Sequence, residues 1–264
     1  MNKTNNKYSF IGHLEILRWH LLRSVIASVI CSLIVFFNKS LVFDKIIFAC
    51  KENDFPTYVL LCKISDNFCI KDMPFILMNI DLSGQFLMHL LVSFVGGIIL
   101  AFPYILFELW RFISPALYKS EKTTSIFLFL TSFLLFILGV IFGYYVIVPF
   151  SINFLSTYAV SGSIENNIHF ISFIKTIVTV VITSGILFQL PLIIYALTKF
   201  ELITPDKLRQ YRRHSFVIIL ILASILTPPD IFSQILIGLP IFLLYEISVI
   251  ISSISIKKYD SSSK

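Results

Sequence analysis

TSIFLFLTSFLLFILGVIFGYYVIV, residues 124–148, is an apolar run that contains no charged side chain. As a helix it would extend about 37 Å at 1.5 Å per residue, which exceeds the ~30 Å hydrocarbon core of a bilayer. Five further apolar runs occur along the chain, at 21–37, 85–107, 168–196, 214–227 and 231–256. Together the six runs predict an all-α integral membrane protein with six transmembrane helices.

The composition supports a membrane protein and excludes several other classes. Of the 264 residues, 57% are hydrophobic and 14% are charged, whereas soluble chains average about 45–50% apolar and about 25% charged residues. These values exclude a water-soluble domain, a disordered chain, collagen and a coiled coil. Too few residues remain outside the runs for a large catalytic domain, so we expect no enzyme. We expect one membrane domain over 1–256 and a short polar tail over 257–264.

The last two spans are predicted to be short. Between Arg213 and Pro228 lie only fourteen residues, or about 21 Å of helix, so this span must thin the bilayer or hide against its neighbours. The sixth run contains Pro240, which favours a kink or a shortened helix there. A re-entrant hairpin over 214–256 is the alternative.

Basic residues define the expected topology. Fifteen of the 21 Lys and Arg residues lie on the side that includes both termini, five lie in the loop after the first run, and Lys175 lies within the fourth run. Because Lys and Arg accumulate in cytoplasmic loops, both termini are predicted to lie on the cytoplasm-equivalent side. The net charge of +6 therefore reflects membrane orientation, and we expect no binding to nucleic acid.

The four cysteines do not indicate a metal site. Cys50, Cys62 and Cys69 lie in the loop after the first run without a CxxC pair or a nearby histidine, so a zinc site is not expected. One disulfide among these three residues is one interpretation, if the loop faces an oxidising space. Unpaired thiols are the other.

Three polar clusters flank or interrupt the apolar runs. They are HLEILRWHLLR (13–23), AFPYILFELWRFISPALYKSEK (101–122) and LTPPDIFSQILIGLPIFLLYE (226–246). The first cluster contains Glu15 and Arg18 at the point where a helix enters the membrane. Arginine in this position commonly snorkels and sets topology, so a functional role needs further support.

The second cluster combines aromatic and acidic residues. Phe112 fits an interfacial aromatic belt, whereas Glu108 and Glu121 are acidic on a face that is otherwise basic. Glu121 either pairs with Arg111 or Lys122 or binds a cationic ligand, and both interpretations stay open here.

Polar residues within the later runs form a third group of candidates. Asp230 and Gln234 lie on one helix face because they are four residues apart, and Gln189 lies within the fourth run. Polar groups at membrane depth are energetically costly and commonly face protein, water or a partner.

These segments resemble the TatC family, the multi-spanning receptor of the twin-arginine protein translocase. Residues 13–22 are similar to the family signature His-Leu-x-Glu-Leu-Arg-x-Arg-Leu, and residues 103–122 to Pro-x-x-x-Tyr-Gln-x-Trp-x-Phe-x-x-Pro-x-Leu-Tyr-x-x-Glu. FGYYVIVP (142–149), FQLP (188–191) and LTPPDIFSQ (226–234) match later segments. The matches follow the family order over nearly the whole chain.

The resemblance implies a receptor without a cofactor that is not an enzyme. It would bind signal peptides carrying paired arginines on the cytoplasmic face and recruit single-span TatA/TatB-type subunits. Folded proteins would then cross the lipid bilayer at the expense of the proton gradient, without ATP. The receptor is also expected to self-associate.

Site residues follow from the same resemblance. Glu121 matches the loop glutamate that contacts the paired arginines, and Phe112 and Pro115 match the aromatic residue and proline of that loop. Arg18 matches the first arginine of the N-terminal motif, whereas His20 replaces the second.

Further positions match or depart from the family pattern. Gln189 matches a polar position linked to partner docking, and Asp230 and Gln234 match a polar pair at the start of span six. Glu15 stands one position before the family's glutamate, a shift of about 100° around a helix. Glu108 replaces the usual glutamine. Both carboxylates remain candidates for signal-peptide binding.

Location and alternative functions complete the expectations. The abundance of Phe, Ile, Asn and Lys is typical of AT-rich coding DNA and favours a mitochondrial inner membrane, with a bacterial inner membrane or a plastid thylakoid membrane as alternatives. A proton-coupled secondary transporter of a small solute is the main alternative function, although no internal repeat supports it. A haem-bearing respiratory subunit would need paired axial ligands on facing spans, and of the five histidines only His89 lies well within a run.

Overall fold

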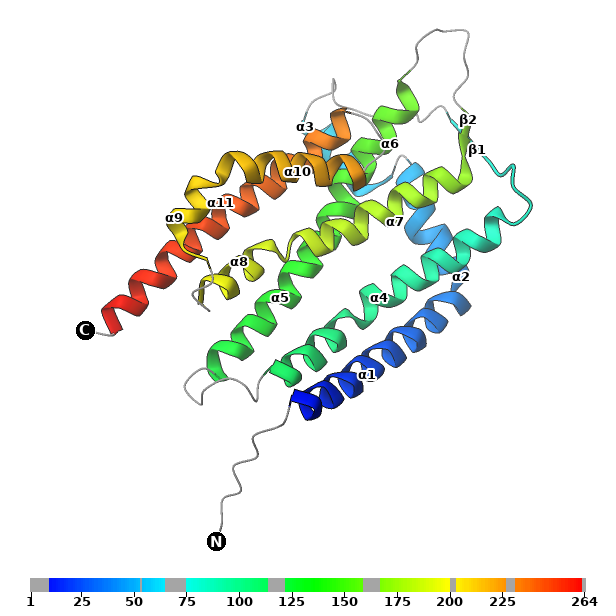
Figure 1. Cartoon of the computed structure of the whole chain (residues 1–264). Coiled ribbons are helices and arrows are strands. Elements are labelled where there is room, and N and C mark those ends of the chain that lie inside the picture. Colours follow the sequence, from blue (N-terminus) through cyan, green and yellow to red (C-terminus); the bar gives the residue numbers. More distant parts are fainter. Residues whose placement is uncertain are drawn as a thin grey trace. The chain divides into compact units, whose positions relative to one another are not determined.

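The computed structural model describes residues 10–52, 54–64, 75–113, 122–158, 167–199, 203–226 and 231–262. Helices make up nearly all of this part of the chain (Figure 1). Five helical segments in it are long and apolar enough to cross a membrane, Leu14–Phe37, Gly84–Phe112, Leu128–Thr157, Phe170–Thr198 and Ile237–Ile254. The prediction of an all-α multi-pass membrane protein is confirmed, with five candidate spans in place of six.

The predicted fifth run forms a helix that is too short to count as a span. This helix, α10 (Arg212–Leu226), has 15 residues and is about 22 Å long. The last helix, α11 (Ile231–Ser262), has 32 residues and continues through Pro240, so the helix does not end there. Its candidate span, Ile237–Ile254, has 18 residues and is the shortest of the five. Proline is tolerated inside transmembrane helices because neighbouring groups satisfy the freed backbone. α11 also extends into the residues predicted to form a tail.

The chain divides into two compact units. The first contains α1 (Phe10–Phe37), α4 (Gly84–Ile113) from Ser93 onward, and α5 (Lys122–Phe142) up to Phe133. The second contains the rest of α4 and α5 together with the remaining elements.

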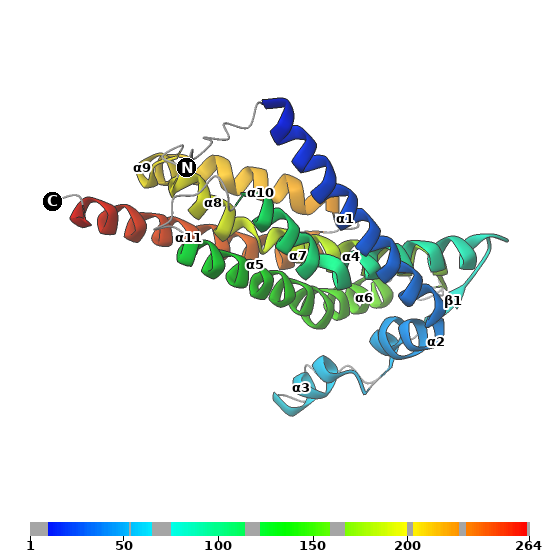
Figure 2. The same cartoon turned by 90° about the horizontal axis from the view of Figure 1, so that it is seen from below.

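Small residues form the contact between α1 and α4 in the first unit. Ser24, Ser28 and Ser32 repeat every four residues, and each hydroxyl donates to the carbonyl one turn earlier at 2.8–2.9 Å. A Cβ atom added at Gly97 would lie 2.5 Å from the backbone nitrogen of Ser32. The two backbones are therefore in close contact, and the helices lie side by side in Figures 1 and 2. Such small-residue seams are how helices associate in lipid.

A second small-residue contact joins α5 and α7 (Phe170–Leu187) in the second unit. A Cβ atom added at Gly139 would lie 2.6 Å from the Ser184 carbonyl oxygen, and one at Gly185 would lie 2.8 Å from the Phe136 ring. Gly143, one turn after Gly139, begins the π-helical segment η6 (Gly143–Ile147). η6 continues into α6 (Val148–Thr157), so one helical segment runs from α5 to α6.

Hydrogen bonds attach the C-terminal helix to its neighbours in the second unit. α11 packs against α8 (Leu190–Lys199), α9 (Pro205–Gln210) and α10, and these helices lie together in Figure 2. The buried Tyr245 hydroxyl donates to the Leu208 carbonyl at 2.7 Å, and the hydroxyls of Thr198 and Ser252 are hydrogen-bonded at 2.8 Å. These bonds satisfy polar groups that would otherwise be buried without partners.

The loop after α1 packs against η6 within the second unit. It contains α2 (Lys39–Val42), η1 (Phe43–Ile47), η2 (Phe48–Lys51) and α3 (Pro56–Ile64). The Tyr144 hydroxyl on η6 donates to the Ile46 carbonyl at 2.5 Å, and the Thr57 hydroxyl donates to the Tyr145 carbonyl. The Phe55 ring stacks on Tyr145 at 5.5 Å. The loop and η6 are thus joined by two hydrogen bonds, each from a side chain of one segment to the backbone of the other.

Two short strands, which the sequence did not predict, pair in parallel in the second unit. β1 (Ile76–Met78) aligns Ile76 with Asn167 of β2 (Asn167–His169). Beside this pair, His169 Nε2 lies 3.6 Å from Asp81 Oδ2. The strands join the segment before α4 to the segment before α7.

The cysteines differ in state. Cys62 is disulfide-bonded, whereas Cys31 and Cys50 are free thiols. Cys50 is completely buried, and burial raises the pKa of its thiol to about 12. Burial also raises the pKa of Tyr58, whose hydroxyl donates to the Cys50 carbonyl at 3.0 Å.

Substituting Gly139 by alanine is expected to destabilise the protein, because the added methyl would overlap the backbone of α7. Overpacking of this kind costs about 1–3 kcal/mol. Thermal unfolding of purified protein in detergent measures the change. Gly238→Ala is the control, because only the flexible end of Leu220 approaches that position, at 3.3 Å. Equal unfolding midpoints for the two variants would contradict the close contact.

Cys50 is expected to resist alkylation in the folded protein. Thiol reagents react with the thiolate, and a pKa of about 12 keeps the thiol protonated at neutral pH, with the thiolate appearing only as the pH approaches that value. Maleimide treatment at pH 7.5, followed by mass spectrometry of the Cys50 peptide, should show labelling only after denaturation. Equal labelling before and after denaturation would show that Cys50 is accessible.

Candidate functional site

The structure describes six of the nine predicted site residues. Glu15, Arg18, Glu108 and Phe112 belong to the first unit, and Gln189 and Gln234 belong to the second. The predictions for Pro115, Glu121 and Asp230 lie outside the described residues.

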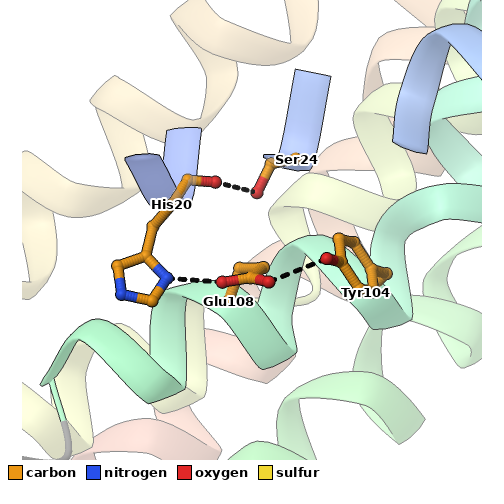
Figure 3. Close-up of polar contacts among 4 residues, drawn as sticks. All are labelled: His20, Ser24, Tyr104 and Glu108. Carbon is orange, nitrogen blue, oxygen red and sulfur yellow. Dashed lines mark hydrogen bonds and ion pairs between the residues drawn. The ribbon is translucent and has the colours of Figure 1, made fainter. Parts of the chain in front are cut away.

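Glu108 is the centre of a polar cluster between α1 and α4 (Figure 3). Its side chain is only 2% exposed. Its Oε2 atom accepts a hydrogen bond from Nδ1 of His20 on α1, and its Oε1 atom accepts one from the Tyr104 hydroxyl at 2.8 Å. Tyr104 lies one turn before Glu108 on α4, and the carboxylate joins this turn to α1. Burial of a carboxylate is tolerated only when it is paired in this way.

His20 links Glu108 to Phe112 within the same unit. The His20 and Phe112 rings meet edge to face, with centroids 6.1 Å apart. Phe112 lies one turn after Glu108, so the two residues point from the same face of α4. His20 thus holds two neighbouring side chains of α4, one through a hydrogen bond and one through its ring.

The local sequence explains why these residues meet. His20, Ser24, Ser28 and Ser32 repeat every four residues and therefore form one stripe along α1. Gly97 faces Ser32 at one end of this stripe, and Glu108 faces His20 at the other. Helices that run antiparallel place these two contacts three turns apart on each helix. The small residues bring the helices close enough for His20 to reach the carboxylate.

Glu15 and Arg18 lie elsewhere on α1. Both are exposed, and the ion pairs found in the described part of the chain do not include either of them. They are therefore accessible to a ligand, unlike Glu108. The structure brings Glu108 and Phe112 together and leaves Glu15 and Arg18 on an open surface.

The two predicted glutamines lie in different contacts of the second unit. Gln189 occupies the break between α7 and α8, where its backbone N–H bonds to Ile186 and its carbonyl accepts from Leu192 and Ile193. Pro191, which lacks an N–H, explains why the helix restarts there. Gln234 on α11 donates its side-chain amide to the Leu220 carbonyl of α10 at 3.0 Å. Each glutamine therefore lies at a helix–helix junction.

Sequence reasoning missed the partners of Glu108. The structure pairs Glu108 with His20 and Tyr104, and the sequence alone pointed to neither residue as a partner of this carboxylate. The available signal was the four-residue repeat of small residues that follows His20. No group of three or more metal-binding side chains occurs among the described residues.

Glu108→Ala is expected to destabilise the protein by about 1–3 kcal/mol, because the half-buried His20 ring and the Tyr104 hydroxyl both lose a buried acceptor. Glu108→Gln should lower the stability less, since an amide oxygen still accepts a hydrogen bond. Glu15→Ala, an exposed change in the same unit, should stay within about 0.5 kcal/mol of the parent. Thermal unfolding in detergent measures all three variants, and a Glu108→Ala midpoint equal to that of Glu15→Ala would contradict the cluster.

Comparison with known proteins extends this description. A family model described as "Sec-independent protein translocase protein (TatC)" matches residues 12–240. The chain is 40% identical to the Sec-independent protein translocase protein TatC of Blattabacterium sp. subsp. Periplaneta americana, over 98% of this chain and 100% of that protein. It is 34% identical to the TatC protein of Aquifex aeolicus, over 93% and 95% of the two chains.

Solved structures agree with these sequence matches. The crystal structure of a twin arginine translocase receptor TatC superposes with a TM-score of 0.73 at 31% identity, covering 92% of this chain and 98% of that one. A structure of the receptor in DDM gives a TM-score of 0.74 at 32% identity, over 91% and 99% of the chains. The sequence relatives named above are bacterial, so the predicted mitochondrial location has no support from them.

Proposed function

The chain belongs to the TatC family and is the receptor subunit of a twin-arginine, Sec-independent protein translocase, and we propose that its first unit presents the site for twin-arginine signal peptides. The protein is a translocase receptor and not an enzyme. This assignment replaces the transporter and haem-subunit alternatives. The observation that carries the proposal is the joining of α1 to α4 through His20, Glu108 and Phe112, because both predicted recognition segments belong to these helices or directly follow them.

Glu121 is proposed to bind the paired arginines, with Phe112 and Pro115 in the same recognition segment. A carboxylate suits this role because a guanidinium offers a planar pair of N–H donors, and charge-assisted bonds are about twice as strong as neutral ones. Arg18 and Glu15 are proposed to border the site. Their exposure on α1 supports this role, since each is available to a ligand.

Glu108 is proposed to act on the same site indirectly. Its two oxygens are already bonded to His20 and Tyr104, and its side chain is almost fully buried. We propose that it positions Phe112 by holding α4 against α1, rather than contacting the signal peptide itself.

Docking of single-span TatA/TatB-type subunits is proposed to involve Gln189, Asp230 and Gln234. Gln189 lies within the candidate span Phe170–Thr198, at the break between two helices. A break in a helix leaves polar groups that can bond to a neighbouring helix. Hydrogen bonds between such groups help helices to associate within the membrane. Gln234 is half-buried at the junction with α10.

Membrane topology and location are also proposals. We propose that both termini lie in the cytoplasm, that α10 makes the short fifth of six crossings, and that residues 1–256 act as one membrane domain followed by the tail 257–264. The bacterial relatives favour a bacterial inner membrane, where the proton gradient would drive transfer of folded proteins. Self-association within the bilayer belongs to the same proposal.

Glu121→Gln is expected to weaken binding of a twin-arginine signal peptide by about tenfold, the loss of a charge-assisted bond. Binding of a twin-lysine peptide, which is weaker in the parent, should change less. Fluorescence anisotropy of labelled peptides with purified receptor in nanodiscs measures both affinities.

Asp206→Asn is the matched control, because Asp206 is an exposed carboxylate at the start of α9, on the face proposed to be cytoplasmic. It should leave both affinities unchanged. Equal and negligible losses for both peptides in Glu121→Gln would refute the proposed site.

A further inference from the structure

A groove of about 510 Å³ lies in the second unit, between the loop after α1 and the first residues of α4 and α7. Phenylalanines form much of its wall, namely Phe43, Phe48, Phe86 and Phe170. Polar side chains line it as well, including Lys39, Ser40 and Asp44 on the loop. The groove therefore combines an apolar wall with charges of both signs.

The groove lies where candidate spans meet the polar loops. Lys39 lies two residues after the end of the candidate span Leu14–Phe37. Phe86 is in the first turn of the candidate span Gly84–Phe112, and Phe170 is the first residue of the candidate span Phe170–Thr198. A chain that crosses back and forth ends its first span and begins its second and fourth spans at the same membrane face. The groove is thus at the depth where lipid headgroups join their acyl chains.

The two charges of the groove are available to a ligand. Lys39 and Asp44 are both exposed, and neither belongs to an ion pair in the described part of the chain. Lys39 can donate hydrogen bonds to a phosphate oxygen, with the Ser40 hydroxyl beside it as a second donor. Asp44 can accept hydrogen bonds from an ammonium group.

We propose that this groove binds a phospholipid whose headgroup carries a primary ammonium, of the phosphatidylethanolamine type. Lys39 binds the phosphate, Asp44 binds the ammonium, and an acyl chain lies along the phenylalanines. Phosphatidylcholine fits less well because its quaternary nitrogen has no N–H to donate to Asp44. Phosphatidylglycerol has no cation and places its negative phosphate near the Asp44 carboxylate.

Native mass spectrometry tests this site without any signal peptide, so the result is independent of the receptor proposal. The full-length protein, freed of lipid in detergent, is mixed with equal amounts of phosphatidylethanolamine, phosphatidylcholine and phosphatidylglycerol that carry identical acyl chains. The parent is expected to retain phosphatidylethanolamine about two- to fivefold better than phosphatidylcholine, the range of an exposed charge contact.

Substitutions of the groove residues test whether the preference for phosphatidylethanolamine arises in the groove. Asp44→Asn should bind the two zwitterionic lipids equally, and Lys39→Gln should bind all three lipids more weakly. Lys45→Gln is the matched control, because Lys45 is an exposed neighbour on η1 that does not line the groove, and it should behave as the parent. Unchanged thermal midpoints show that the variants are folded.

Two results would overturn the proposal. One is equal retention of phosphatidylethanolamine and phosphatidylcholine by the parent. The other is a preference that persists in Asp44→Asn, or that disappears in Lys45→Gln as well, since either would place the selectivity outside the groove.

Discussion

The first unit depends on the close approach of α1 and α4. In lipid the hydrophobic effect does not drive one apolar helix against another, so packing and hydrogen bonds must hold them. Most large side chains of α1 are exposed, including Val25, Val29 and Leu33. The contacts with α4 include the stripe of serines that meets Gly97, the buried Val35 beside Gly96, and the His20–Glu108 bond at the other end of the stripe. The small residues set the distance between the helices, and the buried bond sets their relative position along the axis.

This arrangement is the basis for the indirect role proposed for the buried carboxylate of Glu108. Glu108 is inaccessible, yet His20 connects it to Phe112, which lies at the end of α4 just before the proposed recognition segment. On the proposed function, a change at Glu108 would therefore act on the site through Phe112 and not through a direct contact with the signal peptide. Glu15 and Arg18 differ because they are exposed, so their proposed role is direct contact with the ligand.

Much of the fold could be predicted because apolar runs are a local property of the sequence. Residues 124–148 indicated a span, and the structure has a helical segment over Leu128–Thr157 that is long and apolar enough to be one. The helices of the first loop and the pairing of β1 with β2 depend on contacts between distant segments, which one sequence does not reveal. The same applies to the site. Glu108 and Phe112 stood out by residue type, but the His20–Glu108 bond joins positions 88 residues apart. The predictions for Glu121, Pro115 and Asp230 lie outside the described residues and remain predictions.

The hydrogen bonds between η6 and the loop after α1 have a mechanical consequence. Tyr144 and Thr57 each bind a backbone carbonyl of the opposite segment, so the loop is fastened to the helical segment that contains η6. A rotation or axial displacement of that segment is transmitted directly to the loop surface. The surface formed by the loop is in this way coupled to the orientation of the helix behind it.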